Sequence, residues 1–312
     1  MAKMTDSPRP CPICNLDHTE IWFRSDRAPG PVVRCQRCGL VYVSPILNRR
    51  ALIQDGPLLG SLDPAVLHSA DLSGIAGCPE QAQLPATEAE GPALRRNAAH
   101  ALDRIRRYAQ PPGRLLDFGC GWGFFLATAK ERGWEPFGLE PLPWRAIYAR
   151  AMFGATVVTD TLRQDSFPVE FLDVVTSFQV FEHLPDPAAD LARLYRFLKP
   201  RGLLLVEVPN VETWGVRLLG ARHRHFHPDH FTYFSHRTLS LLLETQGFEE
   251  LDSYHPARHM TGRRLAAVWG RRLLPRRAAH AAEALTYRLG LTNKILTIDL
   301  GDIVAVIARK RP

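Results

Sequence analysis

The chain has 312 residues, of which 46% are hydrophobic, and it carries a formal charge of +7 at pH 7. This length allows one sizeable α/β core with a small additional module, and no apolar run reaches the roughly 18 residues of a membrane-spanning helix. The basicity is local, because residues 258–311 hold 12 Lys or Arg against 3 Asp or Glu, whereas the rest of the chain holds 27 against 29. The net charge therefore does not define a partner for the whole protein.

The first ten residues, MAKMTDSPRP, lack the apolar stretch of a signal peptide, so we expect a cytoplasmic protein. Four cysteines follow in two Cys-x2-Cys pairs, Cys11 with Cys14 and Cys35 with Cys38. Their spacing is typical of a tetrahedral zinc site, and four thiolates leave no coordination position open. We therefore predict a zinc ribbon over residues 1–45 with a structural Zn²⁺, whose binding would supply the folding energy that so small a module lacks.

Residues 46–92 are rich in Pro, Gly, Ala, Leu and Asp and show no clear periodicity. They are predicted to form a linker that covers the active site. From Ala93 to Tyr108, apolar residues recur at helical spacing, which predicts a helix beside the first strand of the main domain. We place that domain at residues 93–312.

The stretch RLLDFGCGWGFF reads as a buried strand, a glycine turn and the start of a helix that ends at Gly133. A second strand, EPFGLEP, leads to Glu140, which stands 23 residues after Asp117. A strand, a glycine turn, a helix and a strand with a terminal acid form the layout of a nucleoside-binding α/β unit. The glycines are spaced GxGxG, however, and not GxGxxG as in a dinucleotide fold.

Further strands are predicted for GATVV, for FLDVVTSF up to Gln179, and for GLLLVEVP. Asp186 and Pro187 are the N-cap and first residue of a predicted helix, PAADLARLYRFL. Ser235 caps a later helix, with Phe234 and Leu239 at the positions of a hydrophobic staple, and Gly247 ends it.

Residues 93–257 and the final strand together resemble class I S-adenosylmethionine-dependent methyltransferases. The resemblance lies in the segments LLDFGCGWG, GLEP, DVVTSFQVFEHLPDP and LKPRGLLLVEVPN. It implies a methyltransferase with a doubly wound, Rossmann-like sheet of seven mostly parallel strands. In that fold DIVAVIARK would be the antiparallel last strand, and a helical insert at about residues 258–298 would precede it.

The resemblance also implies how the cofactor, S-adenosylmethionine, is bound. The glycine loop would face the methionine moiety with Asp117 near its ammonium group, Glu140 would accept hydrogen bonds from the ribose, and Asp160 with Thr161 would lie near the adenine. The cofactor has an amine and a sulfonium but no phosphate, so close backbone approach and carboxylates suit it. The full set predicted to bind it is Asp117, Gly119, Gly121, Gly123, Glu140, Pro141, Asp160, Thr161 and Gln179.

Methyl transfer to a hydroxyl requires positioning of the acceptor and removal of its proton. Glu182 and His183 follow the fourth strand and should lie at the carboxyl edge of the sheet, where an imidazole with an ordinary pKa of about 6.5 suits a general base. The alternative role for His183 is a hydrogen bond that orders its loop. Five histidines follow between residues 223 and 236, and His227 and His230 are the predicted catalytic candidates among them. No carboxylate or cysteine pattern there defines a metal site.

The insert alternates Arg pairs with Leu, Ala and Trp at roughly helical spacing and is interrupted by Pro275. A basic amphipathic helix can lie on an anionic membrane, here the inner membrane face, or meet nucleic acid. The alternative is a solvated face of helices that cover the substrate pocket.

The motifs CxxCGLVYVSP and HFTYFS, beside this core, resemble those of bacterial methyltransferases that act on sugars and other small molecules. Deoxysugar C-methyltransferases with such an N-terminus are longer and carry a further C-terminal domain, which we do not expect here. Instead of sugar C-methylation we therefore predict O-methylation of a hydroxyl on a glycan, lipid-linked or secondary-metabolite intermediate. One alternative is an RNA methyltransferase that uses the ribbon and the basic insert, and another is a non-catalytic cofactor-binding regulator.

Overall fold

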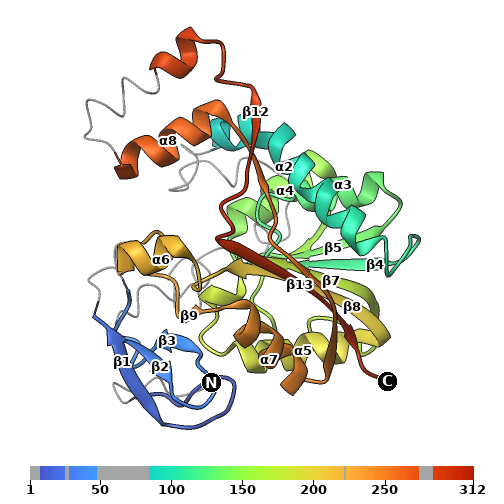
Figure 1. Ribbon diagram of the computed structural model, residues 1–312. Coiled ribbons are helices and arrows are strands. Elements are labelled where there is room, and N and C mark those ends of the chain that lie inside the picture. The colour runs from blue at the N-terminus through green and yellow to red at the C-terminus, as the bar shows by residue number, and fades with distance from the viewer. Residues whose placement is uncertain (1–7, 25–27, 48–83, 221–222, 274–283) are drawn as a thin grey trace.

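The computed structural model describes residues 8–24, 28–47, 84–220, 223–273 and 284–312. Most of the predicted linker (residues 48–83) and the interruption at Pro275 lie outside these ranges. The centre is a seven-stranded sheet in the order β10-β13-β8-β7-β4-β5-β6 (Figure 1). Its strands are β4 (Arg114–Phe118), β5 (Glu135–Leu139), β6 (Thr156–Val158), β7 (Leu172–Phe178), β8 (Leu198–Pro209), β10 (Phe248–Tyr254) and β13 (Ile303–Lys310).

Within this sheet β13 is antiparallel to both of its neighbours, β8 and β10, while β4, β5, β6, β7 and β8 pair in parallel. Helices cover both faces, so the predicted doubly wound, mostly parallel sheet with an antiparallel last strand is confirmed (Figure 1). The carboxyl ends of β4, β5 and β7 lie side by side, and the segments that follow them carry the predicted site residues.

Side chains alternate between the two faces of the sheet, as a pleated strand requires. On one face, Leu115 packs with α2 (Leu84–Ile105) and α3 (Phe124–Glu131). On the other, Leu116 packs with α5 (Pro187–Phe197) and α7 (His236–Thr245). A further helix, α4 (Pro143–Phe153), connects β5 to β6 in the chain and lies beside α3 (Figure 1). The strands are therefore buried on both sides.

The predicted caps are present. The Asp186 side chain accepts a hydrogen bond from the Ala189 amide at 3.0 Å, and Pro187 is the first residue of α5. Ser235 caps α7 in a capping box with Thr238. Phe234 and Leu239 share one apolar cluster, and Gly247 follows the helix with a φ of +87°.

Helix α2 and strand β10 differ from the prediction. Helix α2 begins at Leu84 rather than Ala93 and continues through Pro92, and its early part is held by a tertiary contact, because the amide of Thr261 donates to Glu90 at 3.1 Å. Strand β10 was not predicted, since its sequence FEELDSY is acidic and lacks β-branched residues. It forms because one edge of the sheet is open to pair with it.

The insert contains the predicted helix, α8 (Gly262–Leu273), but also two strands that pair with each other, β11 (Arg258–Thr261) and β12 (Ile295–Ile298). The Asn97 side chain of α2 holds β11, because it donates to the His259 carbonyl at 3.0 Å and accepts from the His259 amide at 2.9 Å. In the part of the chain that the structure describes, no helix combines the length and apolarity needed to cross a membrane. Contact of the insert with a membrane surface or nucleic acid stays a prediction.

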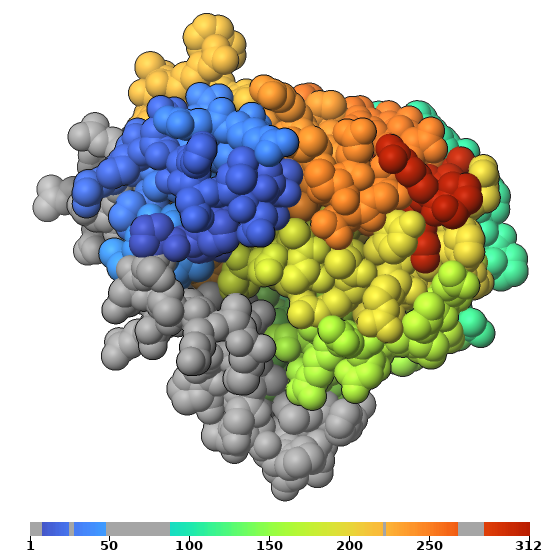
Figure 2. Space-filling view, turned by 90° about the horizontal axis from the view of Figure 1, so that it is seen from below, coloured from blue at the N-terminus to red at the C-terminus, as the bar shows by residue number. Residues whose placement is uncertain are grey.

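The N-terminal ribbon consists of β1 (Thr19–Phe23), β2 (Val32–Cys35) and β3 (Val41–Val43), which pair antiparallel. A fourth strand, β9 (Thr232–Tyr233), comes from the segment after β8 and pairs with β3. Figure 2 shows the ribbon in blue, in broad contact with the orange and yellow C-terminal half of the chain. The ribbon therefore shares a sheet with the main domain, across the boundary predicted at residue 45.

Candidate active site and cysteine centre

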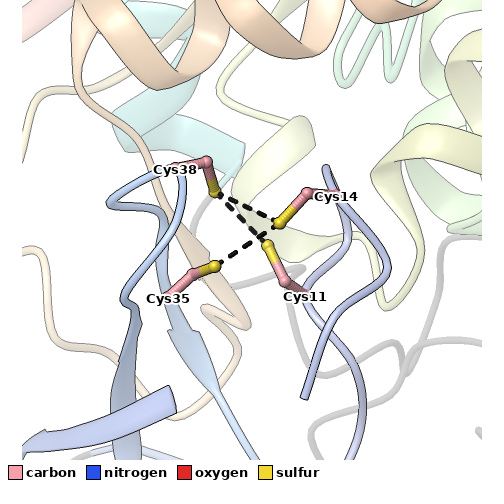
Figure 3. A group of neighbouring side chains, drawn as sticks. All are labelled: Cys11, Cys14, Cys35 and Cys38. Carbon is pink, nitrogen blue, oxygen red and sulfur yellow. Dashed lines mark hydrogen bonds between the residues drawn. The ribbon is translucent and has the colours of Figure 1, made fainter. Parts of the chain in front are cut away.

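The four predicted zinc ligands converge. The Sγ atoms of Cys11, Cys14, Cys35 and Cys38 all lie within 4.8 Å of one another, and the Sγ atoms of Cys11 and Cys38, and those of Cys14 and Cys35, are 3.5 Å apart (Figure 3). Tetrahedral zinc with Zn–S bonds of about 2.3 Å requires separations of about 3.8 Å.

Without a cation the Cys14 thiol stays protonated at pH 7, because burial and the neighbouring thiols raise its pKa to about 11. Binding of a metal ion would therefore release its proton. Side chains of this kind at this spacing fit a structural Zn²⁺.

The three glycines of the loop after β4 have different surroundings. A Cβ atom at Gly119 would lie 2.4 Å from Val180, and one at Gly123 would lie 2.6 Å from Ala149, so packing of the chain itself requires these two glycines. A Cβ at Gly121 would meet no atom of the described residues within 4 Å. Gly121 is therefore the member of the motif beside which a ligand has room to approach the backbone.

Glu140 lies directly after β5 and is buried. Its Oε2 accepts a hydrogen bond from the Gly121 amide at 2.8 Å, and its Oε1 accepts one from Leu142 at 3.0 Å. The carboxylate thus joins the glycine loop to the start of α4.

Asp117, near the end of β4, is 3% exposed. Thr176 donates a hydrogen bond to its Oδ1 at 2.8 Å. Burial nevertheless raises the pKa of this carboxyl to about 7, and the nearby Glu140 adds to the effect. A buried carboxyl of this kind fits a cationic ligand, because an ammonium group would stabilise its ionised form.

The remaining predicted cofactor residues are placed as follows. After β6, Asp160 accepts from the Thr161 amide at 2.7 Å and forms an ion pair with Arg163 at 2.8 Å. Pro141 stands between Glu140 and Leu142, the N-cap of α4. Gln179 follows β7 with a φ of +57° and donates through its side chain to Glu207 at 3.3 Å. Their contact with the cofactor stays a prediction.

Three of the four catalytic candidates come together. The short helix η5 (Phe181–His183) follows β7, and one donor atom from each of Glu182, His183 and His230 lies within 4.8 Å of the others. The His183 and His230 rings meet edge to face with centroids 4.6 Å apart. The amide of Phe231 donates to the Glu182 carbonyl at 2.7 Å, so a backbone hydrogen bond fixes the two loops against each other. We call Glu182, His183 and His230 the acceptor cluster.

The hydrogen bonding of His183 fixes its tautomer. Its Nδ1 lies 2.9 Å from the carbonyl oxygen of Asp229, and a carbonyl can only accept, so Nδ1 carries the proton. Nε2 is then left with a lone pair. Burial lowers the pKa of His183 below its ordinary 6.5, so the ring is neutral at pH 7 and able to take up a proton.

The other two members of the cluster are also neutral at pH 7. Burial raises the pKa of Glu182 to about 8 and lowers that of His230 to about 3. Within the described ranges, Oε2 of Glu182 and Nδ1 of His230 are buried without a hydrogen-bond partner. Buried polar atoms without a partner point to a ligand or an ordered water at this place. Glu182, His183 and His230 also have the donor types of a metal site, and Glu182 adds a carboxylate from outside the histidine-rich segment.

The other histidines have different surroundings. His227 is exposed and forms a hydrogen bond with Asp229. His225 is buried with Nε2 2.9 Å from the Asp302 carbonyl, and burial lowers its pKa to about 2, which indicates a structural role. His236 pairs with Glu250 at 2.8 Å.

Sequence reasoning missed Asp229, whose carboxylate and carbonyl contact His183 and His227. The available signal was an acid between two of the histidines, in HPDH. It also missed Arg9, which contacts the loop that holds His230.

Comparison with known proteins agrees with this geometry. A methyltransferase domain family matches residues 92–253. A "Probable S-adenosylmethionine-dependent methyltransferase" of Mycolicibacterium smegmatis is 31% identical over 140 residues, which cover 45% of this chain and 53% of that protein. A "Ubiquinone biosynthesis O-methyltransferase" of Psychrobacter cryohalolentis is 32% identical over 109 residues, which cover 31% of this chain and 41% of that protein. The chain thus spans about half the length of the curated relatives it matches.

Among solved structures, an S-adenosylmethionine-dependent methyltransferase from Archaeoglobus fulgidus aligns with 69% of this chain and 94% of its own, at 24% identity and a TM-score of 0.47. The matched family segment covers more than half of the 312 residues and contains the glycine loop, Glu140 and Glu182–His183. The chain therefore belongs to the methyltransferase domain family and has the seven-stranded sheet of the class I S-adenosylmethionine-dependent enzymes.

Proposed function

We propose that this protein transfers a methyl group from S-adenosylmethionine to a hydroxyl oxygen of a small-molecule acceptor, such as a glycan, lipid-linked or secondary-metabolite intermediate. The observation that carries the proposal is His183, a neutral imidazole at the carboxyl edge of the sheet, whose Nδ1 is held by the Asp229 carbonyl so that Nε2 keeps its lone pair. A hydroxyl acceptor needs such a base, and several relatives are named ubiquinone biosynthesis O-methyltransferases.

S-adenosylmethionine, when bound, supplies an electrophilic methyl group on a sulfonium. The chain's own residues bind and orient it: Gly121 allows approach to the backbone, Glu140 accepts from the ribose hydroxyls, and Asp117 faces the ammonium group. Pro141, Asp160, Thr161 and Gln179 line the same strand ends. These roles explain why two carboxyls are buried beside the glycine loop, where no phosphate cradle is needed.

At the acceptor side, Nε2 of His183 takes the hydroxyl proton as the methyl group is transferred. The Asp229 carbonyl holds the ring in the tautomer that can do so. Among the described residues, Oε2 of Glu182 and Nδ1 of His230 have no hydrogen-bond partner, and we assign these atoms to the orientation of the acceptor. His227, the fourth candidate, is exposed and pairs with Asp229, so it contributes to the site through that carboxylate.

Substitution of His183 tests this assignment. We expect His183→Ala to lower turnover by about 10²-fold, since general-base catalysis is worth at least that much, while the cofactor affinity measured by calorimetry is unchanged. In the wild type, activity should rise with pH as His183 loses its proton, with an apparent pKa below 6.5, and this limb should be absent in the variant.

The control is His236→Ala, because His236 pairs with Glu250 away from the acceptor cluster. If cofactor affinity and melting temperature fall together with activity and the pH limb survives, His183 orders its loop and is not the base. The same pH profile of His230→Ala and His227→Ala would then locate the base.

The acceptor class is tested with pure protein, radiolabelled cofactor and separated lysate fractions of lipid, RNA and small molecules. We expect label in the small-molecule or lipid fraction. Label in RNA would favour an RNA methyltransferase instead. Cofactor binding without any labelled fraction would favour a non-catalytic regulator.

A further inference from the structure

We propose that Arg9 is a positioning residue that couples the cysteine centre to the acceptor cluster, by holding the two loops that carry Glu182–His183 and His230. The inference rests on the proposed function for the role of these groups. It concerns a residue of the ribbon that touches no part of the glycine loop or of Glu140 in the contacts described above.

The guanidinium of Arg9 donates to three carbonyl oxygens from three separate segments. Nε donates to Val43 of β3 at 2.7 Å, Nη2 donates to Phe231 at 3.0 Å, and Nη1 donates to Pro185. Pro185 stands two residues after His183, and Phe231 directly follows His230. A planar group with five N–H donors can bridge three acceptors in this way, whereas a lysine ammonium lacks the fork geometry.

Arg9 is itself anchored to the ribbon. Its amide donates to Ser44 Oγ at 2.8 Å, and its carbonyl accepts from Ser44 Oγ and from the Tyr42 hydroxyl at 3.2 and 3.3 Å. The guanidinium also lies over the Tyr42 ring, 5.2 Å from its centroid. Cys11, two residues further along the chain, is one of the four thiols of the cysteine centre. Arg9 is therefore separated from the cysteine centre by a single residue, Pro10, and is anchored on the same ribbon.

Phe231 connects the contact with Arg9 to the acceptor cluster. The Phe231 carbonyl that receives Arg9 also accepts from the Val43 amide at 2.9 Å, and the Phe231 amide donates to the Glu182 carbonyl at 2.7 Å. The ribbon, the His230 loop and η5 are thus joined through one peptide unit on each side of Phe231. Loss of the guanidinium would leave the Pro185 loop without its tie to the ribbon and loosen the spacing within the acceptor cluster.

The charge of Arg9 is maintained at working pH. An arginine side chain keeps its proton in proteins at neutral pH. The hydrogen bonds to the three carbonyls are therefore charge-assisted, and this class of hydrogen bond is the stronger one. A neutral side chain of similar length keeps the packing on Tyr42 but cannot make them.

The test compares Arg9→Met and Arg9→Lys with Arg34→Met, a matched control whose arginine is exposed on β2 of the same ribbon. For each protein we would measure cofactor affinity by calorimetry, turnover, and the titration of His183 by NMR, with the signal assigned from its absence in His183→Ala. For Arg9→Met we expect cofactor affinity within about twofold of wild type, turnover at least tenfold lower, and a His183 titration moved up towards its ordinary range. Arg9→Lys should lie between Arg9→Met and the wild type, and Arg34→Met should match the wild type.

Two results would overturn the proposal. One is an unchanged His183 titration and turnover in Arg9→Met with only a lower melting temperature, which would make Arg9 purely structural. The other is the same shift in Arg34→Met, which would make the effect unspecific. Should Arg9→Met fail to fold, Ser44→Ala, which removes the anchor of the Arg9 backbone, gives the same readout in a milder form.

A separate experiment tests the coupling between Arg9 and the cysteine centre. Wild-type protein treated with a zinc chelator should show the same upward shift of the His183 titration while it retains cofactor affinity, and an unchanged titration would remove this part of the proposal. The NMR readout needs no acceptor, so a failure of the proposed methyl acceptor class is distinguishable from a failure of the linkage.

Discussion

Asp117 and Glu182 are buried carboxyls whose pKa values are raised to about 7 and about 8, chiefly by burial. At pH 7 Glu182 is therefore mostly protonated and Asp117 about half protonated, and each stands beside one half of the proposed reaction. Asp117 belongs to the cofactor side and Glu182 to the acceptor side. The same physical cause, desolvation of a carboxylate, thus prepares one group to meet a cation and the other to donate a hydrogen bond.

For Asp117 this leads to a pH-dependent cofactor affinity. Its pKa of about 7 in the folded protein lies above the ordinary 3.8, so below pH 7 an incoming ammonium group must displace a proton. We expect affinity to rise about tenfold per pH unit towards pH 7 and to level off above it, since only the ionised form pairs with the ammonium.

Calorimetry between pH 5 and 8 in buffers of different ionisation enthalpy measures both the affinity and the proton released. In Asp117→Asn the slope should vanish. A slope that survives in this variant would assign the proton to another group.

Glu140 should contribute to cofactor binding by charge-assisted hydrogen bonds to the ribose. We expect Glu140→Ala to weaken cofactor binding by roughly 1 to 3 kcal/mol. Because the carboxylate also accepts from the Gly121 and Leu142 amides, part of this loss is a looser glycine loop. Glu140→Gln keeps one acceptor oxygen and should lose less, and equal affinity for the wild type and both variants would contradict the assignment.

At the scale of elements, the ribbon and the main domain are less separate than the residue boundary at 45 implies. Three of the cysteines lie in one apolar cluster with Leu239 and Leu242 of α7, and β9 completes the ribbon sheet. The sequence predicts that chelation unfolds residues 1–45 while the core keeps its cofactor affinity. With the shared sheet in view, we expect the loosening to extend to residues 223–235.

Limited proteolysis before and after chelation, beside cofactor calorimetry, measures this extent. New cleavage sites at residues 223–235 together with retained cofactor affinity would support it, and cleavage confined to the first 45 residues would show that the ribbon unfolds alone. Metal analysis of freshly purified protein should find about one zinc per chain, because the four thiols form one closed set. Clearly less than one zinc would count against the metal itself.

At the scale of the whole molecule, the insert is tied to the sheet by an ion pair. Arg258 of β11 contacts Glu207 of β8, whose side chain is 4% exposed and also accepts from Gln179. We expect Arg258→Met to lower the free energy of unfolding by about 3 kcal/mol, because it leaves a buried carboxylate without its cation.

Urea unfolding measures the loss. The double variant with Glu207→Gln should recover most of it, since no buried charge remains. Equal stability of Arg258→Met and the wild type would show that water already solvates Glu207.

The sequence by itself determined the features that depend on short spacings. The cysteine pairs, the GxGxG turn, the terminal acid of β5 and the caps at Asp186 and Ser235 are local patterns of this kind, which do not depend on any tertiary contact. Periodicity gave the sheet strands and helices for the same reason, since a side-chain repeat of two or of 3.6 is written in consecutive residues. The family resemblance added the cofactor and the antiparallel last strand.

Only the tertiary structure decided which distant segments share a site. Strand β10 forms from an unfavourable sequence because it pairs with β13 at the edge of the sheet. Helix α2 begins early because Glu90 accepts a hydrogen bond from the Thr261 amide. The meeting of Glu182 and His183 with His230 and Asp229 depends on a peptide at Phe231 that is fixed by Arg9, more than 200 residues away in the chain. Such contacts are set by chain packing and hydrogen-bond geometry in three dimensions, and no local pattern encodes the distance between them.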